Sequence, residues 1–461
     1  MPLKQFTTDF QNIGQQEFLR PNVGYRYFFD VQKGEIYPSK QNIKLKYVLK
    51  EIPAKKVFKG GLKDAEILVD IGNIERRFNN LIDLAEVDKI GSDKSILQDG
   101  DIVIPKMQPQ MGNIFLNLEH KRYIGSTELL EYSIFKSHNS TFLYYLITSR
   151  KFLSDLAKLE SGKTHRRVNP TDLLKIKIPF IPKSKQDQIV TQIELIEKKI
   201  KELKSQINPA QEIINKVFAR EFKFDLEKFE ELGKEKFFEV EISKFNTPLI
   251  RSTVTQNNHK SEFLKNFLKN NTLFLKDIIT KPIKRGKQPE YTEDGVRVIK
   301  TLNIQKGYIN FDEVQFISDE FLKNNKEKAG IYQNDLLLTS TGMGRGKFAL
   351  YNEEEICFAD SHISITRFNQ EKILPYFLNY YCQSFFGTEQ LKYIEMHIKG
   401  TPEIYETQLN YFQIPDISLK SQQKIVDEIK AELDKQEEMK RKIDAERNKI
   451  DGIIEKAIKN A

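Results

Sequence analysis

Short apolar runs, separated by glycine, proline and asparagine, fill most of the chain and give way twice to long stretches of helical periodicity. Such short runs with turn residues at their ends predict β-strands. In the first half of the chain the predicted strands are residues 67–74, 101–105 and 114–118. In the second half they are residues 296–304, 335–340 and 347–351.

A long helix is predicted over residues 184–220, because apolar residues recur there at alternating steps of four and three. This seam consists of Ile189, Ile193, Ile196, Ile200, Leu203, Ile207, Ala210, Ile214 and Val217. Asn208-Pro209 interrupts the seam, and proline lacks a backbone donor, so we expect a kink or a restart there. A second helix, from about Gln422 to Ile458, has a weaker seam because Gln436 and Lys440 fall within it.

The chain also repeats itself, with a shift of about 230 residues that suits whole domains. IPFIPKSKQDQIVTQI at 178–193 aligns with IPDISLKSQQKIVDEI at 414–429, a shift of 236. FLYYLITS from Phe142 matches FLNYYCQS from Phe377, and DIVI from Asp101 matches DLLL from Asp335. LKEI from Leu49 pairs with LKDI from Leu275, a shift of 226. Four blocks in one order indicate two copies of one domain whose loops differ in length.

The predicted fold class is therefore α+β. We expect two β-rich domains related by pseudo-twofold symmetry and joined by two long helices, which pack antiparallel as a coiled coil because neither has a core of its own. The predicted parts are an N-terminal auxiliary segment, a first β-rich domain, a central helix, an auxiliary linker, a second β-rich domain and a C-terminal helix. Their predicted bounds are 1–43, 44–183, 184–220, 221–270, 271–418 and 419–461.

Charge and composition narrow the function classes. Among 461 residues, Lys and Arg number 73 against 65 Asp and Glu, and the excess of 8 favours an anionic partner such as nucleic acid. Cys357 and Cys382 fit neither a disulfide framework nor a zinc site, which suggests a reducing, cytoplasmic setting. No run approaches the roughly 18 apolar residues of a membrane helix, so a soluble protein is expected.

A β-rich domain, an Ile-Pro exit, a Gln-rich entry into a long helix and then the same unit again resemble the specificity subunits of type I restriction-modification systems. The second copy carries most of the resemblance, with LKDIITKPIKRGKQP, VIKTLNI, DLLLTSTGMGRGKFALY, SHISITRF and IPDISLKSQQKIVDEI. The resemblance covers residues 44–460, about nine tenths of the chain.

The resemblance implies a non-catalytic DNA-binding subunit. Each β-rich domain would be a target-recognition domain that recognises one half of a split, asymmetric DNA site. The helices would act as a spacer and bind two methyltransferase subunits, with restriction and translocase subunits in the same assembly. No cofactor is expected on this chain, since S-adenosylmethionine, ATP and magnesium would serve the partners. A helix of about 35 residues is about 50 Å long, and DNA rises roughly 34 to 36 Å per turn. Such helices could therefore hold the two domains one turn of DNA, or slightly more, apart.

In the second copy the loop TSTGMGRGK, residues 339–347, joins two predicted strands and offers hydroxyls, bare amides and basic groups. Glycines permit close approach to phosphate, and arginine can bind guanine in the major groove. The alternative is a hairpin tip with solvated charges. The candidate DNA-binding residues of this copy are Lys284, Arg285, Lys287, Thr341, Arg345, Lys347, Lys399 and Thr401.

In the first copy the matching loop PKMQPQMGN, residues 105–113, offers glutamines that suit adenine edges. A polar turn, ESGKTHRRVN at 160–169, concentrates positive charge before the Ile-Pro strand. We expect these groups, and a lysine cluster at Lys55, Lys56 and Lys59 thought equivalent to that at 281–287, to contact phosphates or bases. The candidates here are Lys59, Lys106, Gln108, Gln110, Lys163, His165, Arg166 and Arg167.

Enzyme functions receive less support from the sequence. AKLESGKT at 157–164 follows a helix rather than a strand, which argues against a phosphate loop, and no Pro-Pro motif of an adenine methyltransferase occurs. Asp101, Glu119 and Lys121 form a loose set that could hold magnesium. The alternative hypothesis is therefore a self-sufficient magnesium-dependent DNA nuclease or a stand-alone DNA-binding protein, with no catalytic or metal residue assigned in the main hypothesis.

Overall fold

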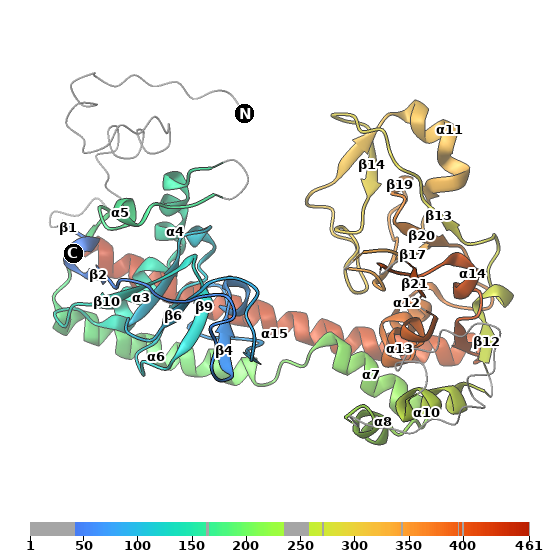
Figure 1. The fold of residues 1–461 in the computed structure, drawn as a ribbon, viewed down its shortest axis with the longest axis horizontal. Coiled ribbons are helices and arrows are strands. Elements are labelled where there is room, and N and C mark those ends of the chain that lie inside the picture. The colour runs from blue at the N-terminus through green and yellow to red at the C-terminus, as the bar shows by residue number, and fades with distance from the viewer. Residues whose placement is uncertain are drawn as a thin grey trace. The chain divides into compact units, whose positions relative to one another are not determined.

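The computed structural model describes residues 42–162, 166–234, 258–269, 272–342, 344–394, 396–398 and 401–460. It contains both helices and sheets, as the sequence predicted. The chain divides into two compact units, which we call unit 1 (residues 1–206 and 440–461) and unit 2 (residues 207–439). Figure 1 shows the elements of each unit, which are described separately below.

Unit 1 contains two main sheets. The four-stranded sheet has the order β2 (Leu49–Glu51), β10 (Leu129–Ile134), β7 (Ile102–Pro105), β8 (Phe115–Leu116). The five-stranded sheet has the order β3 (Lys55–Val57), β6 (Lys94–Leu97), β9 (Tyr123–Ser126), β4 (Glu66–Val69), β5 (Ala85–Val87). Within it only β4 and β9 pair in parallel.

Unit 2 repeats this topology. One sheet has the order β13 (Lys284–Arg285), β20 (Ile363–Thr366), β17 (Leu336–Thr339), β18 (Phe348–Leu350). The other has the order β16 (Gly330–Ile331), β19 (Cys357–Ala359), β14 (Val296–Ile299), β15 (Gln315–Ile317), with β14 and β19 parallel. Apart from β3, which has no counterpart among the described strands of unit 2, the strand order of both sheets matches that of unit 1, as the duplication in the sequence predicted.

A third pairing closes each copy. The strand β1 (Asn42–Lys44) pairs with the Ile-Pro strand β11 (Lys177–Pro179), and β12 (Thr272–Phe274) pairs with β23 (Gln413–Pro415). Both pairings are antiparallel, and the Ile-Pro sequence provides a buried isoleucine in each.

This pairing corrects one block of the sequence alignment. The N–H of Leu45 donates to the carbonyl of Ile176, and the N–H of Leu275 donates to that of Phe412, both at 2.8 Å. Leu45 therefore corresponds to Leu275, and the alignment of Leu49 with Leu275 was wrong. The error arose because Leu-Lys occurs twice within residues 45–50.

The helices follow the strands in both copies. Unit 1 contains α3 (Ser140–Ile147), α4 (Arg150–Leu156), α5 (Pro170–Leu173) and α6 (Lys183–Lys204). Unit 2 contains α7 (Ala210–Glu221), α8 (Leu226–Leu232), α10 (His259–Leu268), α11 (Asp319–Ala329), α12 (Pro375–Gln383), α13 (Phe385–Ile394) and α14 (Glu406–Leu409). The long helix α15 (Leu419–Lys459) begins in unit 2 and ends in unit 1.

The predicted interruption of the first long helix is confirmed. The helix α6 ends at Lys204 and α7 begins at Ala210, directly after Pro209. Proline is tolerated at such a start because its missing N–H falls among groups that have no partner within the helix.

A buried glutamine fixes the start of each long helix. The side chain of Gln186 accepts from the N–H of Asn139 and donates to the carbonyl of Ile181, both at 2.7 Å. The side chain of Gln422 makes the same two contacts, with Leu374 at 2.8 Å and Ile417 at 3.0 Å. Each amide thus joins the helix entry to the N-terminus of α3 or α12, because a buried amide is stable only when it is hydrogen-bonded.

The segment outside the repeat packs on unit 2. Aromatic rings of α8, α10 and the turn before α8 contact Phe385 and Phe386 of α13. The rings of this cluster are Phe224, Phe229, Phe263 and Phe267. Residues 221–270 therefore extend the core of unit 2 where they are described. Residues 1–41 lie outside the described part of the chain.

Across the described ranges, no helix combines the length and the apolar character needed to cross a membrane.

Candidate DNA interface

In each unit two loops that are distant in sequence lie against each other. We call residues 105–113 and 339–347 the hairpin loops, and residues 160–169 and 397–405 the exit turns. Met107 forms a β-bridge with Arg167, and Thr341 forms the same bridge with Glu403. The N–H of Val168 also donates to the carbonyl of Lys106 at 2.9 Å, and in unit 2 Ile404 donates to Ser340 at 3.0 Å. Most of the residues predicted to contact DNA lie on this paired surface.

The hairpin loop of unit 1 exposes one of its two glutamines. Gln108 is exposed, has a φ of 47°, and its N–H donates to the carbonyl of Arg166 at 3.1 Å. Gln110 is half-buried and its side chain is hydrogen-bonded to the carboxyl group of Glu160. Burial raises the pKa of Glu160 above its ordinary value, against the opposing effects of Arg166 and this hydrogen bond. Gln108 is therefore the better placed of the two to contact a base.

Positive charge lies along the exit turn of unit 1. Arg166 and Arg167 are exposed, but the guanidinium of Arg167 is paired with Glu128 through two contacts of 3.0 and 3.1 Å. Lys106 is half-buried. An open groove beside the hairpin loop is lined by Arg76, Phe78, Met107, Gln108 and Met111, among others. The predicted contacts Lys163 and His165 lie outside the described residues.

The hairpin loop of unit 2 is held by its own first threonine. The hydroxyl of Thr339 accepts from the N–H of Lys347 at 2.9 Å and donates to the carbonyl of Gly344 at 2.8 Å. Gly342 and Gly346 have φ values of 83° and 81°, a conformation in which side chains are strained. Arg345 and Lys347 are both partly exposed. The described residues of this loop therefore present Arg345 and Lys347 beside a backbone that the hydroxyl of Thr339 holds.

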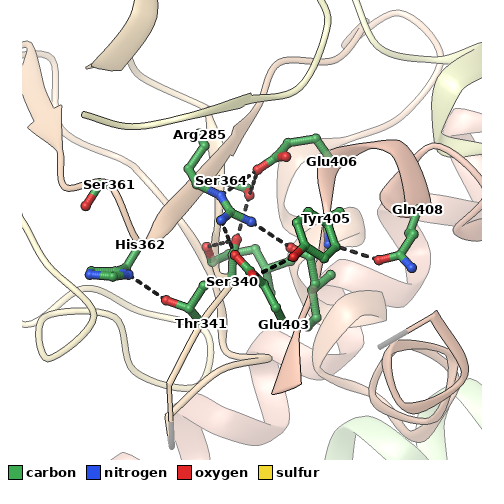
Figure 2. A network of polar contacts seen from close by, with 12 residues as sticks. Arg285, Ser340, Thr341, Ser361, His362, Ser364, Glu403, Tyr405, Glu406 and Gln408 are labelled. Atoms are coloured by element: carbon green, nitrogen blue, oxygen red, sulfur yellow. Dashed lines mark hydrogen bonds and ion pairs between the residues drawn. The ribbon is translucent and has the colours of Figure 1, made fainter. Parts of the chain in front are cut away.

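A polar network fixes the exit turn of unit 2 to the sheet (Figure 2). Arg285 on β13 forms ion pairs with Glu403 and Glu406, the latter at 2.8 Å, and donates to the carbonyl of Ile404 at 3.1 Å. Ser364 donates to Glu406 at 3.1 Å and contacts Ser340 at 2.6 Å. The guanidinium of Arg285 is thus engaged within the protein.

The same network holds the hairpin loop. The hydroxyl of Thr341 lies 2.6 Å from Nδ1 of His362, as Figure 2 shows. Burial alone would raise the pKa of Glu403, but hydrogen bonds from Arg285 and Tyr405 outweigh it, and this pKa lies below its ordinary value. The carboxylate therefore stays charged and keeps the arginine in place.

Other predicted contacts lie elsewhere. Lys284 donates to the carbonyl of Glu327 at 2.9 Å, and Lys287 donates to the side chain of Asn325 at 2.6 Å, so both lie against α11. Lys59 is exposed in the turn after β3, and its N–H donates to Asp93 at 3.0 Å. Lys399 lies outside the described residues, and only the backbone of Thr401 is described, paired with Ile398.

The equivalence of the two lysine clusters stays a prediction. Lys55 and Lys56 lie on β3, which has no counterpart among the described strands of unit 2. The counterpart of β13, which carries Lys284, is β2. Lys284 pairs with Ile365, which corresponds to Glu131 at the shift of 234, whereas β2 pairs with residues 132–134. Lys284 therefore corresponds to a position between the end of β2 and the start of β3.

The acidic partners Glu128, Glu403 and Glu406 were missed by the sequence analysis. The contacts that involve them join segments 39, 118 and 121 residues apart. No local sequence pattern marks such a pair. The only available signal was the repeat shift, which identified the equivalent loops in which these residues lie or which they contact.

The acidic set considered for magnesium contains a residue with a structural role. The carboxylate of Asp101 accepts from the N–H of Ile134 at 2.6 Å, and His120 lies 3.8 Å from it. Glu119 and Lys121 are exposed. Among the residues that the structure describes, no group of three or more His, Cys, Asp or Glu could hold a metal ion.

Residues 28–210 match the family model described as the type I restriction modification DNA specificity domain. A comparison with curated proteins finds no match.

Solved structures similar to this chain include three from type I systems. A chain from a study of complex assembly and conformational transition in the type I R-M system is 14% identical and has a TM-score of 0.41, covering 91% of this chain and 98% of its own. The HsdS subunit from Thermoanaerobacter tengcongensis is 15% identical with a TM-score of 0.33, covering 91% and 96%. The type I S subunit from M. genitalium is 13% identical with a TM-score of 0.37, covering 90% and 95%.

Proposed function

We propose that this chain is the DNA-recognition subunit of a type I restriction-modification system, because residues 28–210 match the family model of the type I restriction modification DNA specificity domain. It binds double-stranded DNA through the hairpin loops and exit turns of both units. The observation that carries this proposal is the duplicated loop surface, in which Met107–Arg167 and Thr341–Glu403 form the same bridge with different side chains.

The target is a bipartite and asymmetric DNA sequence. Each unit has one such surface on the same strand order, so each can contact one half of the site. The surfaces differ in chemistry, since the hairpin loop of unit 1 offers Gln108 and that of unit 2 offers Arg345. Glutamine suits adenine edges and arginine suits guanine, so the two halves differ in sequence.

Within each surface, base contacts and phosphate contacts fall to different residues. Gln108 and Arg345 lie on the hairpin loops and specify bases, whereas Arg166 and Lys347 bind phosphates and position the protein. Lys284, which lies against α11 and outside these loops, adds a further phosphate contact. Arg167 and Arg285 hold the exit turns through their ion pairs with Glu128 and Glu403.

The chain is non-catalytic in this proposal. Two methyltransferase subunits bind its long helices, and restriction and translocase subunits complete the complex. S-adenosylmethionine, ATP and magnesium act on those partners, which carry out methylation and cleavage in the cytoplasm.

Co-expression tests the proposal. The chain should co-purify with a methyltransferase from the same host, and methylation of genomic DNA at a split sequence should require both proteins. Sequencing of methylated bases with and without this chain identifies the site. Magnesium-dependent cutting of DNA by the isolated chain, abolished by Glu119→Ala, would contradict the proposal and favour a self-sufficient nuclease.

A further inference from the structure

The end of a long helix docks on the α-helical pair of each unit. In unit 1 the last part of α15 docks on α3 and α4, and in unit 2 α7 docks on α12 and α13. The two docked segments are equivalent at the repeat shift of 236, which takes Ile214 to Ile450 and Phe218 to Ile454. All four of these side chains are buried. The apolar contacts of the two docking sites therefore do not distinguish one helix end from the other.

The polar part of the docking site in unit 1 is charged. Arg447 is only 2% exposed, and its guanidinium donates to the carbonyl of Arg77 at 2.9 Å and to the hydroxyl of Thr148 at 3.1 Å. Asp451, one turn further along α15, forms ion pairs with Arg447 and Arg77. The Nε of Arg77 donates to the carbonyl of Thr148 at 3.0 Å. The Nε of Arg150, whose side chain is exposed, also lies 3.8 Å from Asp451, so three guanidinium groups surround one buried carboxylate.

The polar part of the docking site in unit 2 is neutral. At the shift of 236, Arg447 corresponds to Gln211 and Asp451 corresponds to Asn215. The amide of Gln211 donates to the carbonyl of Gln383 at 2.5 Å and to Asn215 at 3.1 Å. The side chain of Asn215 accepts from the N–H of Phe385 at 2.9 Å. Gln211 and Asn215 thus bind the junction of α12 and α13, as Arg447 and Asp451 bind the junction of α3 and α4, but with amide groups in place of charges.

The receiving positions differ in the same way. Thr148 directly follows the last residue of α3, and Gln383, at a shift of 235, is the last residue of α12. Arg77 comes three positions after Ile74, as Gly307 comes three positions after Ile304. Arg77 and Gly307 both have a positive φ, 62° and 91°. A Cβ atom on Gly307 would lie 2.3 Å from the side-chain oxygen of Gln383. In unit 2 the glutamine therefore fills space beside a bare glycine, where unit 1 has an arginine.

Four equivalent positions thus carry two alternative sets. The charged set of unit 1 is Arg77, Thr148, Arg447 and Asp451, and the neutral set of unit 2 is Gly307, Gln383, Gln211 and Asn215. We propose that these sets form a matching code, which assigns the end of α15 to unit 1 and α7 to unit 2 and rejects the reverse docking, within one chain or between two copies of it.

A mismatch leaves buried groups without partners. An end with glutamine and asparagine, docked on unit 1, would deprive Arg77 of its carboxylate, although the side chain of Arg77 is only 18% exposed. If instead the end of α15, with its arginine and aspartate, docked on unit 2, its guanidinium would lie against Gln383. The aspartate would then have no second cation to pair with. A buried charge that loses its partner destabilises a protein far more than replacement of the complete pair.

The code also reaches the candidate DNA interface. The N–H of Arg77 donates to the carbonyl of Gly112 at 2.8 Å, and Gly112 lies at the end of the hairpin loop of unit 1. A Cβ atom on Gly112 would lie 2.7 Å from Cγ of Arg77, so the loop and the arginine are in close contact. The docked helix end therefore supports the loop that carries Gln108.

The test converts unit 1 from one set to the other in the full chain. The helix variant is Arg447→Gln with Asp451→Asn, the receiver variant is Arg77→Gly with Thr148→Gln, and the complete variant combines all four changes. Hydrogen exchange of the amides in α3 and α4 is measured in each. We expect exchange to rise on the order of a hundredfold in either partial variant, the scale for an unpaired buried charge. In the complete variant we expect it to return to within about tenfold of the original chain.

The outcomes separate a code from ordinary packing. Losses that add in the complete variant, or a helix variant without any loss, would overturn the proposal. If a partial variant does not fold, the complete variant still must, because it reproduces a set that unit 2 already contains, and its failure to fold would also overturn the proposal. Glu432→Gln with Lys435→Gln, an exposed ion pair on α15, is the control that should leave exchange in α3 and α4 unchanged.

Discussion

At the scale of single residues, opposite charges at equivalent positions perform the same task. Arg167 and Glu403 occupy equivalent bridges in the two exit turns, and each forms an ion pair with a strand or loop of its own unit. In unit 1 the turn supplies the cation and Glu128 the anion, whereas in unit 2 the turn supplies the anion and Arg285 the cation. An arginine near a candidate DNA surface is therefore weak evidence of DNA contact until its partners are known.

Replacing Arg285 should reveal its positioning role. Arg285→Ala leaves Glu403 and Glu406 without their cation, and we expect the free energy of unfolding to fall by roughly 1.5 to 3 kcal/mol, the range for hydrogen bonds to charged groups. Urea denaturation measures this loss. Lys284→Ala is the neighbouring control, and a surface substitution of this kind should cost less than about 0.5 kcal/mol. Equal losses in the two variants would show that the network contributes nothing to stability.

At the scale of secondary structure, a polar residue in a helix seam has a structural reason. Gln436, which weakens the apolar pattern of α15, is buried and accepts from the N–H of Asn208 at 2.9 Å. This N–H lies in the break between α6 and α7, where the helix cannot satisfy it. The proline that breaks one helix is thus matched by an amide in the other.

Replacing Gln436 with an apolar residue should destabilise the protein. Gln436→Leu makes the pattern of α15 more apolar, yet it removes the acceptor of the N–H of Asn208. Because Asn208 is exposed, we expect a cost of about 0.5 to 1.5 kcal/mol, the net value of one hydrogen bond. Thermal denaturation should show a lower Tm for this variant than for Gln436→Glu, which retains an acceptor. A higher Tm for the leucine variant would mean that water satisfies the N–H of Asn208.

The pairing of α7 with α15 should weaken in acid. Hydrogen bonds from Lys424 on α15 and Arg220 on α7 hold the pKa of Glu221 below its ordinary value of 4.5. The unfolded chain binds the proton more readily, so the stabilisation by Glu221 is full above about pH 4.5 and is lost as the pH falls through the lower folded value. The difference in urea midpoint between the original chain and Glu221→Gln should shrink from pH 6 to pH 3. A constant difference would contradict this linkage.

What the sequence could predict depended on the range of the interactions. The seam of α6 and α7, the break at Pro209 and the strands around each hairpin loop were predicted correctly, because local periodicity and turn residues determine them. The ion pair of Arg285 and the docking of Arg447 on Thr148 were not predicted, since they join residues more than 100 positions apart. The strand β3, which carries Lys55, could not be predicted from the repeat because unit 2 has no described counterpart for it.

At the scale of the whole molecule, duplication followed by divergence gives two surfaces that can change separately. Gln108 lies in unit 1 and Arg345 lies in unit 2, and no residue in the described part of the chain is shared by the two hairpin loops. Substitutions at sites without shared partners usually have additive effects. The bipartite model therefore predicts that the free-energy changes of substitutions in the two hairpin loops add in a double variant.

Selection of bound DNA from a random pool should separate the two halves of the site. Arg345→Ala should relax the preference at one base pair of one half, by about 1 to 3 kcal/mol, and Gln108→Ala should do so only in the other half. The double variant should show both changes with their free energies added, whereas Lys284→Ala should weaken all sequences alike because it removes a phosphate contact. If Gln108→Ala and Arg345→Ala relax the same base pairs, the two surfaces bind one continuous sequence, and the assignment of one half-site to each unit is wrong.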